Sequence, residues 1–189
     1  MEFKASRFTR NGTIHCKAAI EDVFPLLCPK REEEWIPGWE CETIWSNSGY
    51  NEEGAVFRTL KPYGTELYWA TVQYDINKKV VDFLITAPHL YLFRFKIELQ
   101  DAGDGRLSIT FTQVFTSLSE KGNDLLKLYE SEDYTERLKK LDEYMSHHLS
   151  KRSGEQGERL TRRLGDAGTR GKSRSGENDR RGEGERAQI

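Results

Sequence analysis

Residues 41–117 alternate apolar and polar side chains in six successive segments, and this alternation restricts the possible folds more than any other feature of the chain. A period of two is typical of strands that bury one face. Short turn-forming runs, among them SGYNEEG, KPYG and QDAGDG, separate the segments, and connections this short join antiparallel neighbours. The pattern therefore predicts an antiparallel meander. Its strands are expected at residues 41–47, 55–60, 65–76, 80–86, 90–99 and 107–117.

One face of this predicted sheet is aromatic and the other is polar. In the run YLFRFKIEL, the phenylalanines share one side with the isoleucine, whereas the arginine and the lysine share the other. Residues 107–117 repeat the pattern, with phenylalanines that alternate with threonines. The parity of residues 65–76 stays open, because Tyr68 and Trp69 are adjacent and both bulky. We therefore expect a dry face that needs a cover and a wet face that does not.

A further strand and two short helices are predicted before this meander. An Asn-Gly pair at residues 11–12 lies between short alternating stretches, so the first strand either bends there or is a hairpin that ends near Ala18. Residues 20–27 carry apolar side chains on one helical face. Residues 30–35 form a second helical piece, which a Pro-Gly pair at residues 37–38 ends. The charged run REEE of the second piece is expected to be a solvated helix face.

The dry face needs a cover, and residues 118–149 are the only helical segment long enough to provide it. Ser117 and Glu120 fit a capping box at its start. Two apolar stripes fall on roughly opposite sides of this segment, so the helix is expected to break between residues 130 and 133. The stripe predicted to face the sheet contains Tyr134, Leu138, Leu141, Met145 and Leu149.

Residues 151–189 differ from the rest of the chain in composition. They contain eight glycines and no aromatic residue, so they cannot bury enough apolar surface to offset their conformational entropy. We therefore predict one folded domain at residues 1–150 and a disordered basic tail at residues 151–189. The tail carries eleven Lys and Arg against seven Asp and Glu, whereas the domain carries 18 against 24. An acidic domain argues against nucleic-acid binding by the domain. The tail is a solvated extension, a weak and salt-sensitive contact for nucleic acid, or a contact for a protein partner.

Cys16, Cys28 and Cys41 are an odd number without paired spacing, which indicates buried thiols in a reducing compartment rather than a disulfide framework. The first 18 residues lack the apolar core of a signal peptide, and no run reaches 18 apolar residues. We expect a cytoplasmic protein without stable membrane insertion. No cofactor or metal is expected either, because His147 and His148 are adjacent and diverge on a helix.

Four stretches carry a resemblance to a known family. They are VFPLLCPKREEEWIPGW at residues 23–39, GAVFRT at 54–59, the pattern WxxxxYD at 69–75 and SLSEKGN at 117–123. In the predicted element order, they resemble the START-like, polyketide cyclase/dehydrase-type superfamily called SRPBCC, and in particular its small bacterial members. The resemblance covers residues 10–149. It implies an α+β helix-grip fold, in which a seven-stranded curved antiparallel sheet wraps around a long C-terminal helix, with two short helices between strands 1 and 2.

The resemblance also implies a hydrophobic cavity between the sheet and the last helix. Members of the superfamily bind lipids, sterols, hormones or polyketides, a minority catalyse cyclisation or dehydration, and others are protein-binding cochaperones. No universal catalytic motif exists, so no catalytic residue is transferred. We expect a protein that binds a lipid-like or aromatic small molecule, with a cyclase/dehydrase-type enzyme and a cochaperone-like role as alternatives. The residues expected to line the cavity are Trp35, Trp39, Phe57, Trp69, Phe83, Tyr91, Phe93, Phe95, Phe111, Gln113, Phe115, Leu138, Leu141 and Met145.

The individual candidates each have an ordinary structural alternative, since aromatic side chains are also common core filler. His89, in a loop, is either a general acid/base that reaches the cavity or a solvent-exposed bystander. Gln113 either orients a ligand or is satisfied by a backbone carbonyl. Arg58 is expected to point into solvent, and an inward position would indicate an anionic ligand head group.

Overall fold

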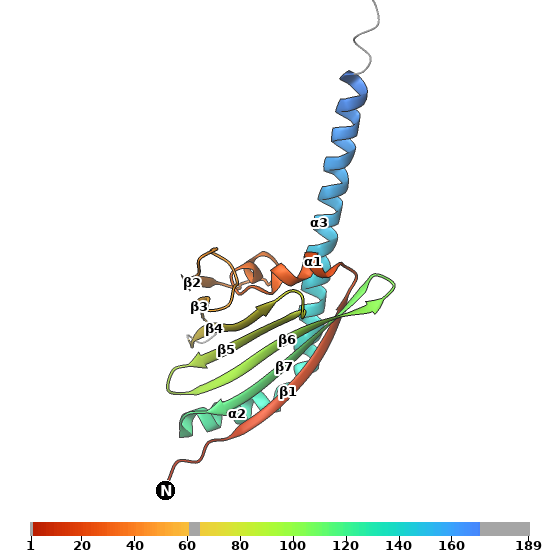
Figure 1. The fold of residues 1–189 in the computed structure, drawn as a ribbon. Helices are drawn as coiled ribbons and strands as arrows, with labels where there is room; N and C mark the ends of the chain where they lie inside the picture. The colour runs from red at the N-terminus through yellow and green to blue at the C-terminus, as the bar shows by residue number, and fades with distance from the viewer. Residues whose placement is uncertain (1, 61–64, 171–189) are drawn as a thin grey trace, which may run out of the picture. The chain divides into compact units, whose positions relative to one another are not determined.

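The structure, a computed structural model, describes residues 2–60 and 65–170 (Figure 1). Contacts within the chain divide it into two units, Met1–Leu149 and Ser150–Ile189. The first unit contains a seven-stranded sheet in the order β1-β7-β6-β5-β4-β3-β2, in which all neighbours are antiparallel. Six consecutive strands form the predicted meander, and β1 joins it by pairing with β7. The strands are β1 (Arg7–Cys16), β2 (Cys41–Trp45), β3 (Val56–Leu60), β4 (Glu66–Asp75), β5 (Val80–Ala87), β6 (Tyr91–Gly103) and β7 (Arg106–Ser117).

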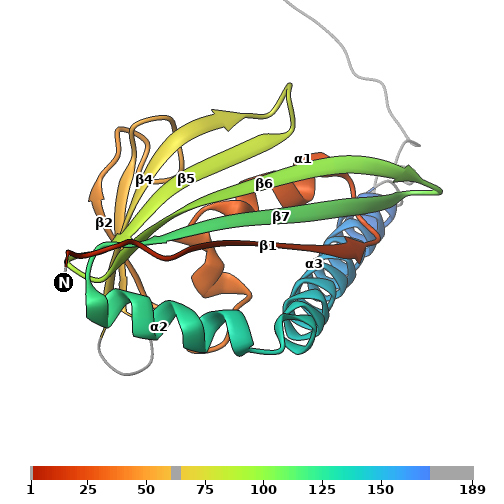
Figure 2. The same ribbon diagram turned by 90° about the horizontal axis from the view of Figure 1, so that it is seen from below.

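Helical segments flank this sheet in the arrangement that the resemblance implied. The pieces between β1 and β2 are short, and the two longer helices follow β7. In Figure 2, α2 and the N-terminal part of α3 lie on one side of the sheet. The helix-grip architecture is therefore confirmed. The helical segments are α1 (Ile20–Val23), η1 (Phe24–Leu27), η2 (Arg31–Glu34), α2 (Glu120–Ser131) and α3 (Tyr134–Arg170).

Gly12 lies in the middle of β1, which is neither a hairpin nor interrupted. The strand pairs with β7 along its whole length, with Gly12 opposite Phe111. A Cβ atom at residue 12 would overlap the side chain of Leu138 and would lie 2.9 Å from Cε1 of Tyr134. The hairpin interpretation of the Asn-Gly pair is therefore wrong, because this glycine leaves room for α3 to approach the sheet closely.

The buried side of β4 contains Trp69 rather than Tyr68. Leu67, Trp69 and Thr71 are buried, whereas Tyr68 and Ala70 are half-buried. In β6 and β7 the buried and more exposed positions alternate in the same way, with the aromatic side chains on the buried face. The predicted dry and wet faces are present, and the dry face carries the core.

The break between α2 and α3 falls at residues 132–133, where the sequence predicts it. The predicted capping residue is wrong, because Ser119 and not Ser117 caps α2. The hydroxyl of Ser119 accepts a hydrogen bond from the backbone N–H of Gly122 at 3.1 Å. Ser117 still belongs to β7, and its buried hydroxyl donates to Oδ1 of Asn123 at 2.5 Å. Pairing of the strand thus continues past the position where local sequence signals start the helix.

The last helix extends further than the sequence predicts. The structure describes residues 151–170 as part of α3, where the composition predicts disorder, and residues 171–189 lie outside the described residues. A helix that already exists grows by single residues without a new nucleation step, and Lys, Arg, Glu and Gln are good helix formers. A low apolar content is therefore compatible with a helix in residues 151–170. Among the described helices, none combines the length and apolarity needed to cross a membrane.

Candidate functional site

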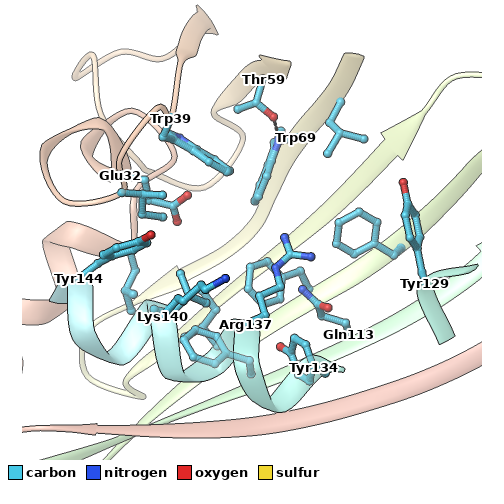
Figure 3. A pocket seen from close by; sticks show the side chains of 18 of the residues that line it. Glu32, Trp39, Thr59, Trp69, Gln113, Tyr129, Tyr134, Arg137, Lys140 and Tyr144 are labelled. Carbon is cyan, nitrogen blue, oxygen red and sulfur yellow. Dashed lines mark hydrogen bonds between the residues drawn. The ribbon is translucent and has the colours of Figure 1, made fainter. Parts of the chain in front are cut away.

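A cavity of about 470 Å³ lies between the dry face of the sheet and α3. Its walls come from the sheet, from the segment around η2, and from the facing parts of α2 and α3. Figure 3 shows side chains from these elements converging on one space. The sheet contributes a wall of aromatic rings, which comprises Trp69, Phe93, Phe95, Phe111 and Phe115.

Most of the residues predicted to line the cavity do so. They are Trp35, Trp39, Trp69, Phe93, Phe95, Phe111, Gln113, Phe115 and Leu141. Contact of any of them with a ligand stays a prediction. Within the described part of the chain, the other five predicted residues lie outside the lining: Phe57, Phe83, Tyr91, Leu138 and Met145.

The predicted residues outside the lining are covered by other side chains. The ring of Trp69 packs edge-on against Phe83, with 5.4 Å between ring centroids. Tyr129 of α2 packs edge-on against Tyr91 at 5.6 Å. Leu138 occupies the space above Gly12. Phe83 and Tyr91 lie on the inward face of their strands, but neighbouring rings fill the space in front of them.

The indole N–H groups of the lining tryptophans are all satisfied. Nε1 of Trp35 donates to the carbonyl of Leu26 at 3.1 Å, and Nε1 of Trp39 donates to the carbonyl of Pro29 at 2.8 Å. Nε1 of Trp69 donates to the hydroxyl of Thr59 at 2.8 Å. Each ring is thus fixed by its polar atom and presents apolar surface to the cavity. This explains the clustered tryptophans at residues 35 and 39: they fix the loop before β2 and wall the cavity.

Arg10 reaches the cavity wall from β1 and was missed by the sequence analysis. Its Nε donates to Oε1 of Gln113 at 2.7 Å, and its guanidinium lies over the ring of Tyr134, 4.4 Å from the centroid. Glu132 lies 3.9 Å from its Nη1. Gln113 therefore lines the cavity, with a guanidinium rather than a backbone carbonyl as its partner. A signal did exist, because Arg10 shares its face of the strand with Ile14.

Burial and the neighbouring charges both affect the pKa of Arg10. Desolvation, followed by the positive charge of Arg137, lowers the pKa of Arg10 from its ordinary value. The nearby Glu132 carboxylate and the tyrosines of the site act in the opposite direction. An arginine stays charged under such a shift, so Arg10 is a fixed cation at the cavity wall.

Glu32 corrects the expectation that the REEE run is a solvated helix face. Its neighbours are indeed near the surface, where Arg31 pairs with Glu34 at 2.7 Å and Lys30 pairs with Glu33 at 2.7 Å. Glu32 itself is only 6% exposed and lines the cavity. Burial raises the pKa of its carboxyl to about 8. Among the side chains and backbone groups that the structure describes, none makes a hydrogen bond or ion pair with this carboxyl.

The first turns of α3 add polar groups to the wall that faces the sheet. Arg137, Lys140 and Tyr144 all line the cavity from this helix (Figure 3). The ammonium of Lys140 also pairs with Glu136 at 3.2 Å. These residues project from one face of the helix because they are three and four positions apart. The cavity thus combines aromatic walls with a few polar groups, a composition typical of small-molecule sites.

Two polar candidates from the sequence lie elsewhere. His89 is exposed in the turn between β5 and β6, with a left-handed φ of 63°, and does not line the cavity. Arg58 points into solvent as predicted, and its Nε donates to Glu42 at 2.8 Å. The three cysteines are buried free thiols. Among the described side chains, no group of three His, Cys, Asp or Glu is arranged to hold a metal ion.

Comparison with known proteins finds similarity in structure alone. No family model matches the chain, and no curated protein matches it in sequence. A norcoclaurine synthase from Thalictrum flavum, in complex with dopamine and hydroxybenzaldehyde, is similar with a TM-score of 0.59 and 12% identity, over 78% of this chain and 88% of that chain. A protein from Rhizobium loti gives 0.55 and 14%, over 77% and 99%. A major latex-like protein from Panax ginseng gives 0.53 and 15%, over 76% and 97%.

These proteins belong to the superfamily that the sequence resembles. At such low identity the likeness concerns the fold, which is also evident in the strand order and the long last helix. The chain therefore has the helix-grip fold of the START-like, or SRPBCC, superfamily.

Proposed function

We propose that the chain binds a hydrophobic small molecule, lipid-like or aromatic, in the cavity between the sheet and α3. The observation that carries the proposal is the cavity itself, whose volume of about 470 Å³ falls in the usual range of roughly 300–1,000 Å³ for small-molecule sites. Its aromatic walls favour apolar ligands, because binding removes apolar surface from water. A ligand that buries about 200 Å² of apolar surface gains roughly 5 kcal/mol before the entropic costs of association.

The rigidity of the walls supports this proposal. Hydrogen bonds hold the indole rings of Trp35, Trp39 and Trp69, so their positions do not have to be ordered when a ligand binds. The rings of Phe93 and Phe115 stack with centroids 4.5 Å apart. The Thalictrum flavum protein of the same fold has been crystallised with two aromatic small molecules, which is also in keeping with an aromatic ligand.

The first test is to look for a ligand that copurifies with the protein. Native mass spectrometry of the full chain is compared with the mass after denaturation and organic extraction. We expect an additional mass that extracts as one apolar compound. The purified, extracted protein is then titrated with N-phenyl-1-naphthylamine, an uncharged probe whose fluorescence rises in apolar surroundings.

A matched pair of variants connects binding to this cavity. Leu141→Trp places extra volume inside the cavity, whereas Leu128→Trp places the same side chain at an exposed position of α2. We expect Leu141→Trp to abolish probe binding and Leu128→Trp to retain it, with both variants folded by circular dichroism. Equal binding by wild type and Leu141→Trp would show that the probe binds elsewhere. A wild type with neither a copurified mass nor probe binding would refute the proposal.

A second candidate is an enzyme of the cyclase/dehydrase type that acts on such a ligand. Gln113 favours it, because the bond from Arg10 fixes its amide at the cavity wall, and a fixed dipole beside a ligand carbonyl can stabilise developing charge. The exposed position of His89 removes that residue as a candidate acid or base. Recovery of a chemically altered compound after incubation, and loss of that conversion in Gln113→Met with binding retained, would support an enzyme.

A further inference from the structure

We propose that Glu32 is the polar recognition group of the cavity, and that the ligand presents an uncharged oxygen acceptor, such as a ketone, to its protonated carboxyl. This inference rests on the proposed binding function and adds the chemistry of the ligand. The geometry that supports it is a nine-tenths buried side chain at one end of the cavity. In Figure 3 its carboxyl points toward the cavity, at the end that Trp39 and Tyr144 also line.

The backbone around Glu32 is held in place from both sides. Within the loop, the N–H of Glu32 donates to the carbonyl of Cys28 at 3.0 Å, and the carbonyl of Glu32 accepts from the N–H of Ile36 at 2.8 Å. The flanking charged residues fix η2 to the first residue of β2. The carboxylate of Glu33 accepts from the N–H of Cys41 at 2.8 Å, and the ammonium of Lys30 donates to the carbonyl of Cys41 at 2.9 Å. Glu32 is therefore positioned in the cavity by contacts that do not involve its own carboxyl.

The surroundings of Glu32 keep the carboxyl neutral near pH 7. Its pKa of about 8 follows from burial. The nearby thiols of Cys28 and Cys41 are uncharged as well, because burial raises the pKa of both, that of Cys41 to about 12. On the near surface, Lys30 and Glu33 neutralise each other. A neutral carboxyl is a hydrogen-bond donor, and a ligand oxygen is the partner that it lacks among the described residues.

The charges on the facing wall argue against a cationic ligand. Arg137 and Lys140 reach the cavity from α3, and Arg10 reaches it from β1. Of the carboxylates, Glu132 lines the cavity near Arg10, and Glu136 pairs with Lys140 outside the lining. A cation placed against an ionised Glu32 would share the cavity with these positive charges, whereas an uncharged oxygen would not be repelled. We therefore assign a neutral acceptor rather than an amine.

Three probes of similar shape test this assignment on the full chain. They are 2-acetylnaphthalene, which has a ketone, 2-ethylnaphthalene, which has no polar group, and 1-(2-naphthyl)ethylamine, which is a cation at neutral pH. Their dissociation constants are measured by quenching of tryptophan fluorescence between pH 6 and pH 9.5. We expect the ketone to bind the wild type about tenfold more tightly than the hydrocarbon. Its affinity should fall as the pH rises through about 8, while that of the hydrocarbon should stay constant.

Variants at Glu32 separate the hydrogen bond from packing. Glu32→Leu should weaken ketone binding about tenfold without weakening hydrocarbon binding, and Glu32→Gln, which keeps a neutral donor, should retain ketone binding within about threefold while removing its pH dependence. Glu34→Gln, at the surface of the same segment, is the control and should behave as wild type. The melting temperature of each variant is recorded, and Glu32→Leu is expected to melt higher than wild type because it removes an unpartnered buried carboxyl.

Three results would contradict the proposal. If Glu32→Leu weakens the binding of ketone and hydrocarbon equally, or leaves the binding of both unchanged, Glu32 does not recognise the oxygen. If the amine binds best, with an affinity that rises with pH, Glu32 is an ionised partner for a cation, and the proposal is wrong while the binding function stands. If none of the three probes binds the wild type, the proposed function fails and takes this inference with it.

Discussion

Replacement of Gly12 by alanine is expected to destabilise the domain, although the same change within a strand usually stabilises it. The added Cβ would overlap Leu138 and would lie 2.9 Å from the ring of Tyr134. Leu138 alone could change rotamer, but the ring of Tyr134 is held beneath the guanidinium of Arg10, 4.4 Å from its centroid. The first turn of α3 therefore has to move away from β1.

The magnitude follows from two opposing terms. Overpacking of a filled site typically costs about 1–3 kcal/mol, and the lost backbone freedom of the unfolded chain returns about 0.5–1 kcal/mol. The net decrease in the free energy of unfolding should be about 1–2 kcal/mol. For a domain of this size, that corresponds to a melting temperature about 2–8 °C lower.

Urea denaturation followed by circular dichroism measures this change, and Asn11→Ala is the control. Asn11 is exposed on the same strand, so its replacement should alter the free energy of unfolding by less than about 0.5 kcal/mol. The double variant Gly12→Ala with Leu138→Ala should lose less stability than the two single changes together, since the smaller side chain makes room for the new Cβ. Unchanged or increased stability of Gly12→Ala would refute the close approach of α3 to β1.

Three further changes test individual interactions. The pKa of Glu32 is raised from 4.5 to about 8 on folding. Its contribution to the free energy of unfolding should therefore be at its maximum below pH 4.5. It should fall as the pH rises to about 8, by at most about 1.4 kcal/mol per pH unit, and Glu32→Gln should abolish this slope in urea titrations. Ser119→Ala removes the cap of α2 and should cost about 1 kcal/mol, whereas Glu120→Ala in the same turn should not. Trp69→Phe leaves the buried hydroxyl of Thr59 without its 2.8 Å donor and should lower the free energy of unfolding by about 1–3 kcal/mol. The same change should cost less in a Thr59→Val background, which has no hydroxyl to leave unpaired.

Local patterns were sufficient for the elements and their order. The alternation in residues 91–99 sets which side chains of β6 face the core, and the turn-forming runs set where the strands end, because both depend on neighbours a few residues away. The change of apolar stripe near residue 130 predicted the separation of α2 from α3 for the same reason. Where a distant segment competed with a local signal, the distant segment prevailed, as at Gly12, which accommodates α3 instead of turning the chain.

The candidate site was predictable only in part. Strand parity predicted Phe93, Phe95 and Phe111 on the inward face, and in the structure these three side chains border the cavity. Parity could not separate them from Phe57 and Phe83, which point the same way but are covered by other groups. Whether a ring borders empty space depends on what the helices leave uncovered, and no periodicity in the sequence records that.

Sequence alone therefore determined an antiparallel sheet with a dry aromatic face and a helix to cover it, since hydrophobic periodicity and turn chemistry are local properties. Tertiary structure decided that the cover is incomplete, that Arg10 holds Gln113 at the cavity wall, and that Glu32 turns inward from a run of surface charges. The physical reason is that burial is a property of three-dimensional neighbours. Glu32 and Glu33 are adjacent and have the same intrinsic chemistry, yet their pKa values shift in opposite directions, because the fold buries the first and pairs the second with Lys30.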